Sequence, residues 1–268
     1  MMKFVYLSFI QFDVKRDLYS NISLIENTIN SVMYNKENTN HIFVLPELSN
    51  CGYLFNSFED VNNYAEDINC GTFINELMRI SSIYNIVIVA GFIEKLNSKL
   101  YNSAIIIESN SINGVYRKIH LTDYEKRFFH YGDINQKSVF TIFDNIKISV
   151  QICFDLWFPE ISRMQVLYGS DILIAIANFG SNTTFEIAKI RAIENLTPLV
   201  LCNRVGRENI SDTYVSYIGK SFISSYDGVI YNNVVENDFY VYTTRLDLYN
   251  KKSNIICSNF LSEINIHY

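Results

Sequence analysis

The sequence predicts an α/β or layered α+β protein, and three observations support this. Apolar runs of strand length recur along the chain, helical patterns lie between several of them, and most runs lack strict alternation, which is typical of strands covered on both faces. Hydrophobic residues make up 49% of the 268 residues, enough for a sizeable core. Because there is no repeat, low-complexity linker or break in composition, one domain over residues 1–268 is predicted.

The predicted strands are runs rich in β-branched and aromatic residues. They are Phe4–Phe12, Ile42–Leu45, Ile86–Ala90, Ser103–Ile107, Lys147–Cys153, Ile172–Ala177 and Leu199–Cys202. Later in the chain, Asp227-Gly228 separates two apolar runs and predicts a hairpin, and the run VYTTRLDLY at 241–249 predicts a further strand. The segments Leu96–Tyr101 and Lys118–Gly132 are expected to be loops or irregular.

Four helices are predicted between these strands, from apolar residues at intervals of three or four. In the first, Leu18, Ile22, Ile25 and Ile29 fall on one face. Proline at the start of the third suits the first turn of a helix. The four ranges are Asp17–Tyr34, Thr72–Tyr84, Pro159–Tyr168 and Thr184–Leu196.

Charge and cysteine content exclude several classes of protein. The net charge is −6, and the 22 basic residues are scattered, so nucleic acid is not an expected partner. Five cysteines, at 51, 70, 153, 202 and 257, form no CxxC and no metal-ligand spacing, so neither a disulfide framework nor a metal site is expected. No signal peptide and no membrane span is visible, which predicts a soluble protein of the cytoplasm.

Three segments share a design in which an apolar strand ends in a reactive side chain: His41–Glu47, Gly114–Lys118 and Ile148–Cys153. Such groups at strand ends are typical of α/β active sites. Taken singly, each has a plain structural explanation, since Cys153 alone fits an inert buried thiol, Glu47 a capping residue and Lys118 a solvated turn residue. However, Pro159 starts a helix shortly after Cys153, so the thiol is expected at a strand-to-helix elbow, near N–H groups that favour a thiolate and an oxyanion.

Five motifs follow one another along nearly the whole chain. They are Val44-Leu-Pro-Glu47-Leu with Gly52-Tyr53, Tyr116-Arg-Lys118-Ile-His120-Leu121 with Glu125, Phe129 and Gly132, Cys153 through Arg163, Arg191-Ala-Ile-Glu194-Asn195, and Asn203-Arg204-Val205-Gly206. In this set and order the chain resembles the nitrilase superfamily, the carbon–nitrogen hydrolases with a Glu-Lys-Cys catalytic set. The resemblance implies an α-β-β-α sandwich of two sheets covered by helices, and a homodimer or larger assembly formed through the third and fourth predicted helices.

Amide hydrolysis by a thiol requires a nucleophile, a base, a stabilised oxyanion and an activated water. The resemblance implies Cys153 as nucleophile and Glu47 as general base, and we expect Lys118 and the backbone N–H of Phe154 to bind the oxyanion. The ammonium of Lys118 is also expected to lower the pKa of the thiol. Glu125 matches a second glutamate of the family and is expected to orient Lys118 or the substrate, the alternative being a surface carboxylate.

Other residues around these three are expected to bind substrate or to support the elbow. His120 is expected to have a structural hydrogen-bonding role rather than to form a Cys-His pair. A scaffold of ion pairs and hydrogen bonds is expected from Asp155, Glu160 and Arg163, with Arg191, Glu194 and Arg204 joining it. The residues expected to line the substrate pocket are Tyr53, Phe129, Trp157, Asn178 and Phe179.

The flanks of the nucleophile bear on the substrate. Branches of the family that hydrolyse true nitriles usually continue with Trp-Glu, whereas this chain has Phe154-Asp155, which favours an amidase or carbamoylase. The prediction is an amidase that cleaves a small amide through a Cys thioester and releases ammonia or an amine. Trp157-Phe-Pro-Glu160 is similar to N-carbamoylputrescine amidases, which makes a carbamoyl-amine hydrolase the alternative.

Three further alternatives are a true nitrilase, an acyl transferase and a catalytically silent scaffold. The chemistry requires no metal or organic cofactor, and no Gly-rich phosphate loop is visible.

Overall fold

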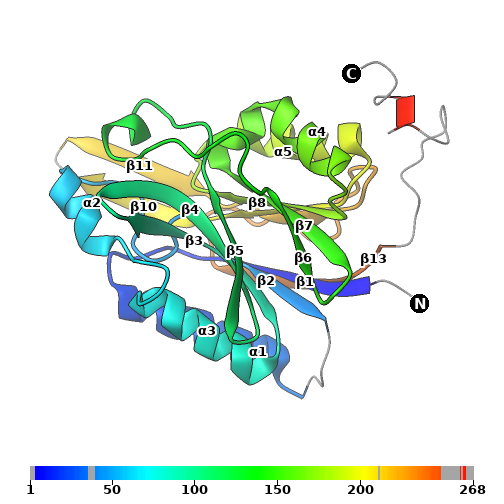
Figure 1. Cartoon of the computed structure of the whole chain (residues 1–268), viewed down its shortest axis with the longest axis horizontal. Coiled ribbons are helices and arrows are strands. Elements are labelled where there is room, and N and C mark those ends of the chain that lie inside the picture. Colours follow the sequence, from blue (N-terminus) through cyan, green and yellow to red (C-terminus); the bar gives the residue numbers. More distant parts are fainter. Residues whose placement is uncertain (1–3, 36–39, 211, 249–259, 261, 264–268) are drawn as a thin grey trace.

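The computed structural model describes residues 4–35, 40–210, 212–248, 260 and 262–263. Two β-sheets pack face to face, and helices cover the outer face of each sheet (Figure 1). The predicted α-β-β-α sandwich is therefore confirmed.

The first sheet has six strands in the order β13-β1-β2-β3-β4-β5. The pairs β1·β2 and β2·β3 are parallel, and the others are antiparallel. The strands are β1 (Phe4–Gln11), β2 (His41–Val44), β3 (Val87–Leu96), β4 (Lys99–Glu108), β5 (Ser111–Arg117) and β13 (Tyr240–Asp247). Helices α1 (Leu18–Met33) and α3 (Thr72–Tyr84) cover its outer face, because apolar residues of both helices share one cluster with this sheet. A short helix, α2 (Phe58–Tyr64), precedes α3.

The second sheet has five strands in the order β12-β9-β8-β7-β6. These are β6 (Val139–Ile142), β7 (Ile146–Ile152), β8 (Ile172–Ala177), β9 (Leu199–Asn203) and β12 (Phe222–Ser224). Helices α4 (Pro159–Leu167) and α5 (Asn182–Asn195) cover this sheet, and the 3₁₀ turn η2 (Cys153–Trp157) joins β7 to α4. A separate hairpin consists of β10 (Val205–Ile210) and β11 (Thr213–Ile218), and a second 3₁₀ turn, η1, spans Glu125–Arg127.

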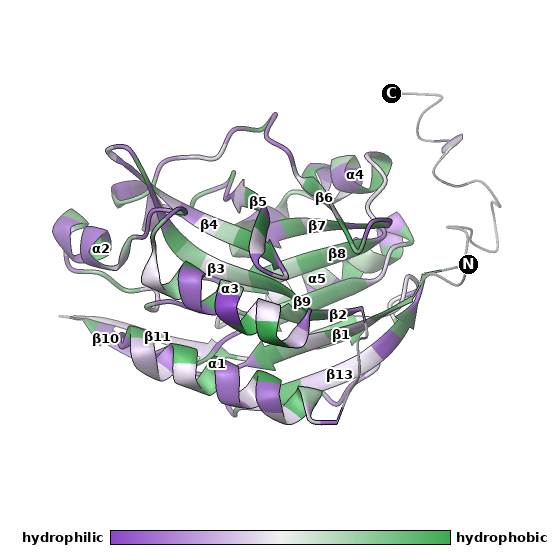
Figure 2. Ribbon diagram, turned by 60° about the horizontal axis from the view of Figure 1, so that its bottom comes forward, coloured by the Kyte–Doolittle hydropathy of each residue, from purple (hydrophilic) through white to green (hydrophobic). Residues whose placement is uncertain are grey.

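The core between the sheets is largely aliphatic. Leu7 and Val89 of the first sheet belong to the same buried cluster as Val150 and Ile174 of the second, all four fully buried. The ribbon coloured by hydropathy shows these central strands as mostly apolar (Figure 2). Each such side chain contributes about 1.5–3 kcal/mol when removed from water, so the two sheets form a rigid support for groups at their ends.

Most predicted elements are confirmed to within a few residues, and α3 and β8 have the predicted bounds. The loop predicted at Leu96–Tyr101 is wrong: β3 and β4 pair up to Leu96 and Lys99, and Asn97, at φ 56°, makes the tight turn. The Asp-Gly turn exists, but its second arm reaches the sheet only through the bridge of Ser224 to Ile230. The sequence analysis missed α2, β6, β10 and β11, which are short or strongly polar. Tyr249, at the end of the last predicted strand, and Cys257 lie outside the described residues.

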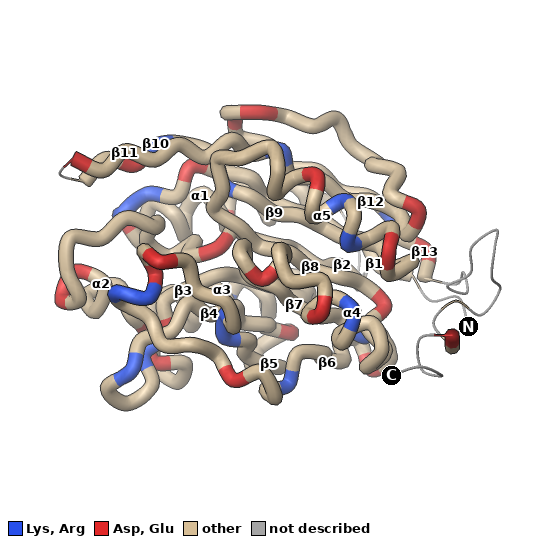
Figure 3. Tube along the Cα trace, turned by 90° about the horizontal axis from the view of Figure 1, so that it is seen from above, with Lys and Arg blue, Asp and Glu red and all other residues tan. Residues whose placement is uncertain are grey.

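Charged residues are scattered over the trace, with blue and red segments interspersed (Figure 3). Within the part of the chain that the structure describes, no helix combines the length and apolar character needed to cross a membrane.

Candidate active site

The three predicted strand ends meet in the structure. Glu47 follows β2 by three residues and Lys118 follows β5 directly, both in the first sheet, while Cys153 follows β7 of the second. Lys118 Nζ lies 2.7 Å from Glu47 Oε1, and both side chains are fully buried. Their 71-residue separation in sequence is therefore closed by the packing of the sheet.

Glu125 is the second carboxylate at this ammonium. Its Oε1 lies 2.6 Å from Lys118 Nζ, and its Oε2 accepts a hydrogen bond of 2.8 Å from the backbone N–H of Thr122. Because Glu125 is fully buried, it is not a surface carboxylate. Glu125 is thus a second anionic partner of the ammonium, beside Glu47.

Asn102 on β4 completes the cluster and was missed in the sequence. Its Nδ2 donates to Glu47 Oε1 at 2.7 Å and to Glu125 Oε1 at 2.8 Å, so the two carboxylates share both Lys118 and Asn102. The one signal in the sequence is a buried-type strand, LYNSAIII, that contains a polar Asn next to Ser103. We call Glu47, Asn102, Lys118 and Glu125 the buried cluster.

One ammonium faces two carboxylates in the buried cluster, which affects their protonation. Burial raises the pKa of Glu47, and the neighbouring Glu125 raises it further, while Lys118 acts in the opposite direction without cancelling the effect. Burial acts to lower the pKa of Lys118, but Glu125 and Glu47 together outweigh it and raise the pKa well above its ordinary value. Lys118 is therefore a permanent cation, and Glu47 is a carboxyl that binds a proton more readily than an ordinary one.

Cys153 lies at the elbow between β7 and η2, with a strained backbone at φ 47°. Its half-buried thiol interacts electrostatically with Glu47, Lys118 and Glu125 and accepts a hydrogen bond from the backbone N–H of Asn178. Lys118 acts to lower the thiol pKa, as expected, but its effect does not prevail. Burial and the charge of Glu47 raise the pKa, and Lys118 offsets them only in part, so the resting group is a thiol rather than a thiolate.

Two polar groups beside the thiol have no hydrogen-bond partner among the described residues. One is Glu47 Oε2, and the other is the side-chain amide of Asn178, both of whose polar atoms are unpaired although the residue is only 7% exposed. Buried polar atoms are rarely left unpaired in proteins, and exceptions mark functional positions. These atoms are therefore available to a proton or to a bound molecule.

The remaining residues expected at the pocket fall into two groups. Tyr53 interacts electrostatically with Glu125, Lys118, Glu47 and Cys153, and burial, with the nearby Glu125, raises its pKa well above the ordinary value. By contrast, Phe129 and Phe179 are buried in apolar clusters, and Trp157 is 44% exposed with its Nε1 donating to Thr184 Oγ1 at 3.3 Å.

Asp155 ties the elbow to the strand end that carries Lys118. Its carboxylate accepts hydrogen bonds from the backbone N–H of His120 and of Ile152 and from the hydroxyl of Tyr116, and it lies 3.0 Å from His120 Nδ1. The ring of His120 also stacks on Phe158 at 3.5 Å. His120 thus contacts Asp155, which accords with a structural role.

On the helix side, Arg191 supports the elbow by donating to Leu156 O at 2.8 Å, and it pairs with Glu194. Arg204 does not join this scaffold as expected, because its side chain pairs with Asp13 and Glu208 instead. In the described residues, no group of three or more His, Cys, Asp or Glu side chains is placed to hold a metal ion.

Comparison with known proteins identifies the family of the chain. A family model described as carbon–nitrogen hydrolase matches residues 7–249. The chain is 38% identical to a nitrilase of Pyrococcus abyssi, over 80% of both chains, and 30% identical to the N-carbamoylputrescine amidase of Arabidopsis thaliana, over 91% of this chain and 87% of that protein. Its fold matches the crystal structure of a carbon–nitrogen hydrolase from Helicobacter pylori with a TM-score of 0.78 at 24% identity, covering 99% of this chain and 94% of that one. The chain belongs to the carbon–nitrogen hydrolase family of the nitrilase superfamily.

Proposed function

We propose that the protein hydrolyses small non-peptide amides through a thioester on Cys153, with Glu47 as general base and acid and Lys118 as the oxyanion-stabilising cation. The observation that carries this proposal is the free Oε2 of Glu47. Its other oxygen is held by Lys118 and Asn102, so the unpaired atom is the one available to take a proton. The raised pKa of Glu47 suits it to return that proton in the next step.

The reaction begins with a neutral thiol, because the pKa of Cys153 is raised. As the sulfur attacks the amide carbon, Glu47 takes the thiol proton, and the negative charge passes to the carbonyl oxygen. Lys118 and the backbone N–H of Phe154, in the first turn of η2, stabilise that oxyanion. The negative charge of Glu47 disfavours a thiolate in the resting enzyme. It does not oppose the attack itself, because Glu47 takes the proton while the sulfur bonds to the amide carbon.

The oxyanion then collapses and the carbon–nitrogen bond breaks, with Glu47 donating its proton to the departing nitrogen. Ammonia or an amine leaves, and an acyl thioester remains on Cys153. Glu47, again ionised, takes a proton from water as the water attacks the thioester, and it then returns this proton to the sulfur. The carboxylic acid leaves and the thiol is restored. Glu125 remains bound to Lys118 throughout and keeps the ammonium in place.

Substrate contacts follow from the unpaired groups and the nearby rings. The amide of Asn178 has a free donor and a free acceptor beside the sulfur, which complement the carbonyl and N–H₂ groups of an amide. Tyr53 lies against the buried cluster. The apolar lining of the pocket further from the sulfur is proposed to come from Phe129, Trp157 and Phe179.

The test is release of ammonia from a panel of small amides, carbamoyl compounds and nitriles. Cys153→Ala should abolish release, whereas Cys70→Ala, at an exposed thiol outside the buried cluster, should retain it. Mass spectrometry of rapidly quenched wild-type protein should show an acyl adduct on Cys153. Ammonia release by wild type that does not exceed the uncatalysed rate on any compound would favour a silent scaffold. Equal release above that rate by wild type and Cys153→Ala would contradict Cys153 as the nucleophile.

Hydrolysis of carbamoyl amines is the second candidate. It is favoured by the Trp157-Phe-Pro-Glu160 segment and by 30% identity to a relative named N-carbamoylputrescine amidase. The same panel separates the two candidates, because a carbamoyl substrate yields carbon dioxide together with ammonia and an amine. Faster turnover of carbamoyl compounds than of simple amides would favour this second candidate.

We also propose that the chain is a single domain of the cytoplasm that forms a homodimer through α4 and α5. The exposed side chains of Ile190 and Ile193 on α5 support this, as does an apolar groove of about 550 Å³ beside α4, lined in part by Met164 and Leu167. Light scattering should give twice the chain mass of 31.1 kDa. A species of one chain mass would contradict the dimer.

A further inference from the structure

The hairpin β10–β11 reaches the loop that follows Glu47 through one carboxylate. Glu208 on β10 accepts hydrogen bonds from the backbone N–H of Tyr53, at 3.0 and 3.1 Å to its two oxygens, and from the N–H of Leu54 at 2.6 Å. The two positions are more than 150 residues apart in sequence. Two consecutive N–H groups directed at one carboxylate form an anion-binding nest, and here a side chain of the same protein fills it.

The loop needs such an anchor because it has few internal bonds. It leaves β2 with Leu48 at φ 47° and turns at Gly52 with φ 93°. The N–H groups of Cys51 and Gly52 both bond to Leu48 O, which closes the first turn but leaves the next two N–H groups to Glu208. A Cβ at Gly52 would lie 2.3 Å from Glu208 Oε1, so the close approach of the carboxylate depends on this glycine.

Glu208 is in turn held in place by Arg204. Arg204, which is fully buried, forms an ion pair with Glu208 through Nη1 and donates to Val14 O at 2.7 Å through Nη2. The guanidinium carbon lies 4.3 Å from the centre of the Tyr217 ring, and that ring in turn meets the Tyr53 ring edge-on at 6.4 Å. Arg204, Glu208, Tyr217 and Tyr53 thus form a closed ring of contacts that fixes both the backbone and the side chain of Tyr53.

The anchored residue faces the buried cluster. The hydroxyl of Tyr53 lies 3.3 Å from Thr122 Oγ1, and the N–H of Thr122 donates to Glu125. The Tyr53 ring also stacks on Tyr124 at 5.6 Å. A shift of the 52–54 backbone would therefore move an aromatic wall of the pocket relative to Lys118 and Cys153.

We propose that Glu208 is a positioning residue that holds Tyr53 against the buried cluster, so that the hairpin β10–β11 sets the shape of the substrate pocket. This rests on the proposed amidase function. Glu208 acts through the loop and not on the reacting atoms, and its loss should weaken substrate binding by the amount that loss of Tyr53 itself does.

The test is a double-mutant cycle on the best amide of the panel, with kcat and KM measured for wild type, Glu208→Gln, Tyr53→Ala and the double variant. Glu208→Gln keeps the size of the side chain but loses the charge and one acceptor. It should raise KM and lower kcat/KM by about 10- to 100-fold, since misplacement by about 1 Å costs up to about 100-fold. In the Tyr53→Ala background the same change should add less than about twofold, because no ring remains to be positioned.

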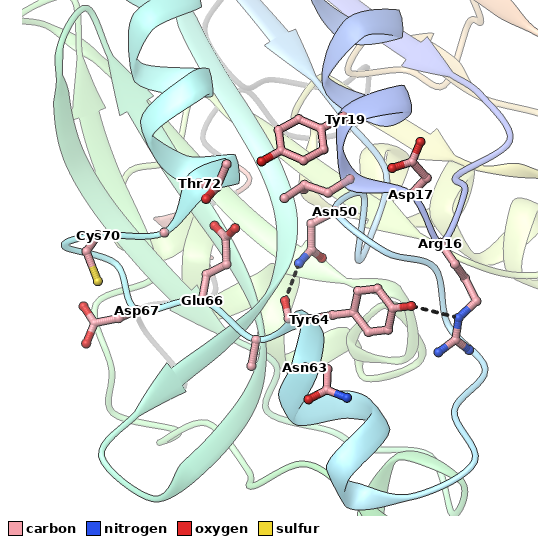
Figure 4. A pocket seen from close by; sticks show the side chains of 13 residues that line it. Arg16, Asp17, Tyr19, Asn50, Asn63, Tyr64, Glu66, Asp67, Cys70 and Thr72 are labelled. Carbon is pink, nitrogen blue, oxygen red and sulfur yellow. Dashed lines mark hydrogen bonds between the residues drawn. The ribbon is translucent and has the colours of Figure 1, made fainter.

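Glu66→Gln is the matched control. Its carboxylate also accepts two consecutive backbone N–H groups, those of Phe73 and Ile74, at 2.8 and 3.2 Å. It caps α3 beside a separate cavity of about 520 Å³, where its side chain points toward the first turn of that helix (Figure 4). Glu66→Gln should keep KM within about twofold of wild type, whatever it costs in thermal stability.

Independent effects of Glu208→Gln and Tyr53→Ala on kcat/KM would overturn the proposal, as would an equal rise in KM from Glu66→Gln. Should Glu208→Gln fail to fold by circular dichroism, Gly52→Ala replaces it in the cycle, since its methyl group displaces the same carboxylate. Failure of the amidase function is a different result: wild type and Cys153→Ala would then release equal ammonia, whereas failure of this inference leaves wild-type activity intact.

Discussion

The ammonium of Lys118 and the carboxylate of Glu47 form an ion pair of 2.7 Å with no solvent access to either side chain. Burying an ion pair costs desolvation energy that its attraction alone seldom recovers, so such a pair is weak evidence for a purely stabilising role. Here the pair is also unbalanced, because Glu125 adds a second negative charge. An arrangement that is costly for stability but holds a base and a cation beside a thiol is what a catalytic site requires.

Replacing Glu47 with Gln should lower turnover but make the thiol of Cys153 ionise more readily. Turnover should fall by about 10²- to 10⁴-fold, the usual contribution of a general base. The pKa of Cys153 should also fall, because the charge of Glu47 helps to raise it while Lys118 remains to lower it. Iodoacetamide labelling of Cys153 as a function of pH, in a Cys70→Ala background, should shift to lower pH. An unchanged or higher midpoint would show that Glu47 does not act on the thiol through its charge.

Replacing Lys118 with Met should destabilise the fold by about 3–5 kcal/mol at neutral pH, because two buried carboxylates lose their cation. The pKa of Glu47, already raised by burial, then loses the cation that opposes this rise and lies further above its value in the unfolded chain. A raised pKa gives stability that is present below the unfolded value, near 4.5 for Glu, and is lost as pH rises through the folded value. The loss in free energy of unfolding caused by Lys118→Met should therefore be largest near pH 7 and become smaller toward pH 4–5. Urea unfolding across this pH range measures it.

Arg79→Met is the control for that series. Arg79 pairs with Glu26 and Glu76 at the surface, with 43% of its side chain exposed. Exposed ion pairs contribute little, so this variant should change stability only slightly across the same pH range. If the stability lost in Lys118→Met did not depend on pH, the loss would come from packing and not from the two carboxylates left without their cation.

The catalytic candidates and the residues that support them differ in how far a local sequence pattern reveals them. Glu47, Lys118 and Cys153 were found because each ends an apolar run, which is a local pattern, and the sandwich follows from the same runs. Asn102 and Glu208 were missed because their importance lies only in their distant partners. The net direction of the Cys153 pKa could not be predicted for a related reason. The motifs indicate Lys118, which lowers this pKa, but they do not show how deeply the thiol is buried or how strongly Glu47 acts on it.

Replacing Asn102 with Leu should shift the acidic limb of the pH profile of kcat/KM to higher pH. The amide of Asn102 donates to Glu47 Oε1, and this hydrogen bond lowers the pKa of Glu47. A hydrogen bond to a charged group contributes about 1.5–3 kcal/mol, and one pKa unit corresponds to about 1.4 kcal/mol, so a shift of about one to two units is expected. Asn195→Leu, which removes a buried amide bonded to Arg191 O, should lower stability but leave the limb in place.

Replacing Gly91 with Ala should displace the base without touching any reacting group. A Cβ at Gly91 on β3 would lie 2.5 Å from Leu48 N, 2.6 Å from Glu47 Cα and 2.7 Å from Pro46 O. These are backbone atoms, which cannot turn aside as a flexible side chain does, so the segment that carries Glu47 must move. We expect kcat/KM to fall by about 100-fold, as for a catalytic group misplaced by about 1 Å, while the protein remains folded by circular dichroism.

Gly169→Ala is the matched control, because its Cβ would meet only the end of the flexible Lys147 side chain at 3.3 Å. At φ 95° the substitution strains the backbone, so it should lower the melting temperature but leave kcat/KM within about twofold of wild type. The two variants thus separate general strain from movement of the base. If Gly91→Ala kept full activity, β3 would not be what fixes the position of Glu47, and the sheet would leave the base free to move.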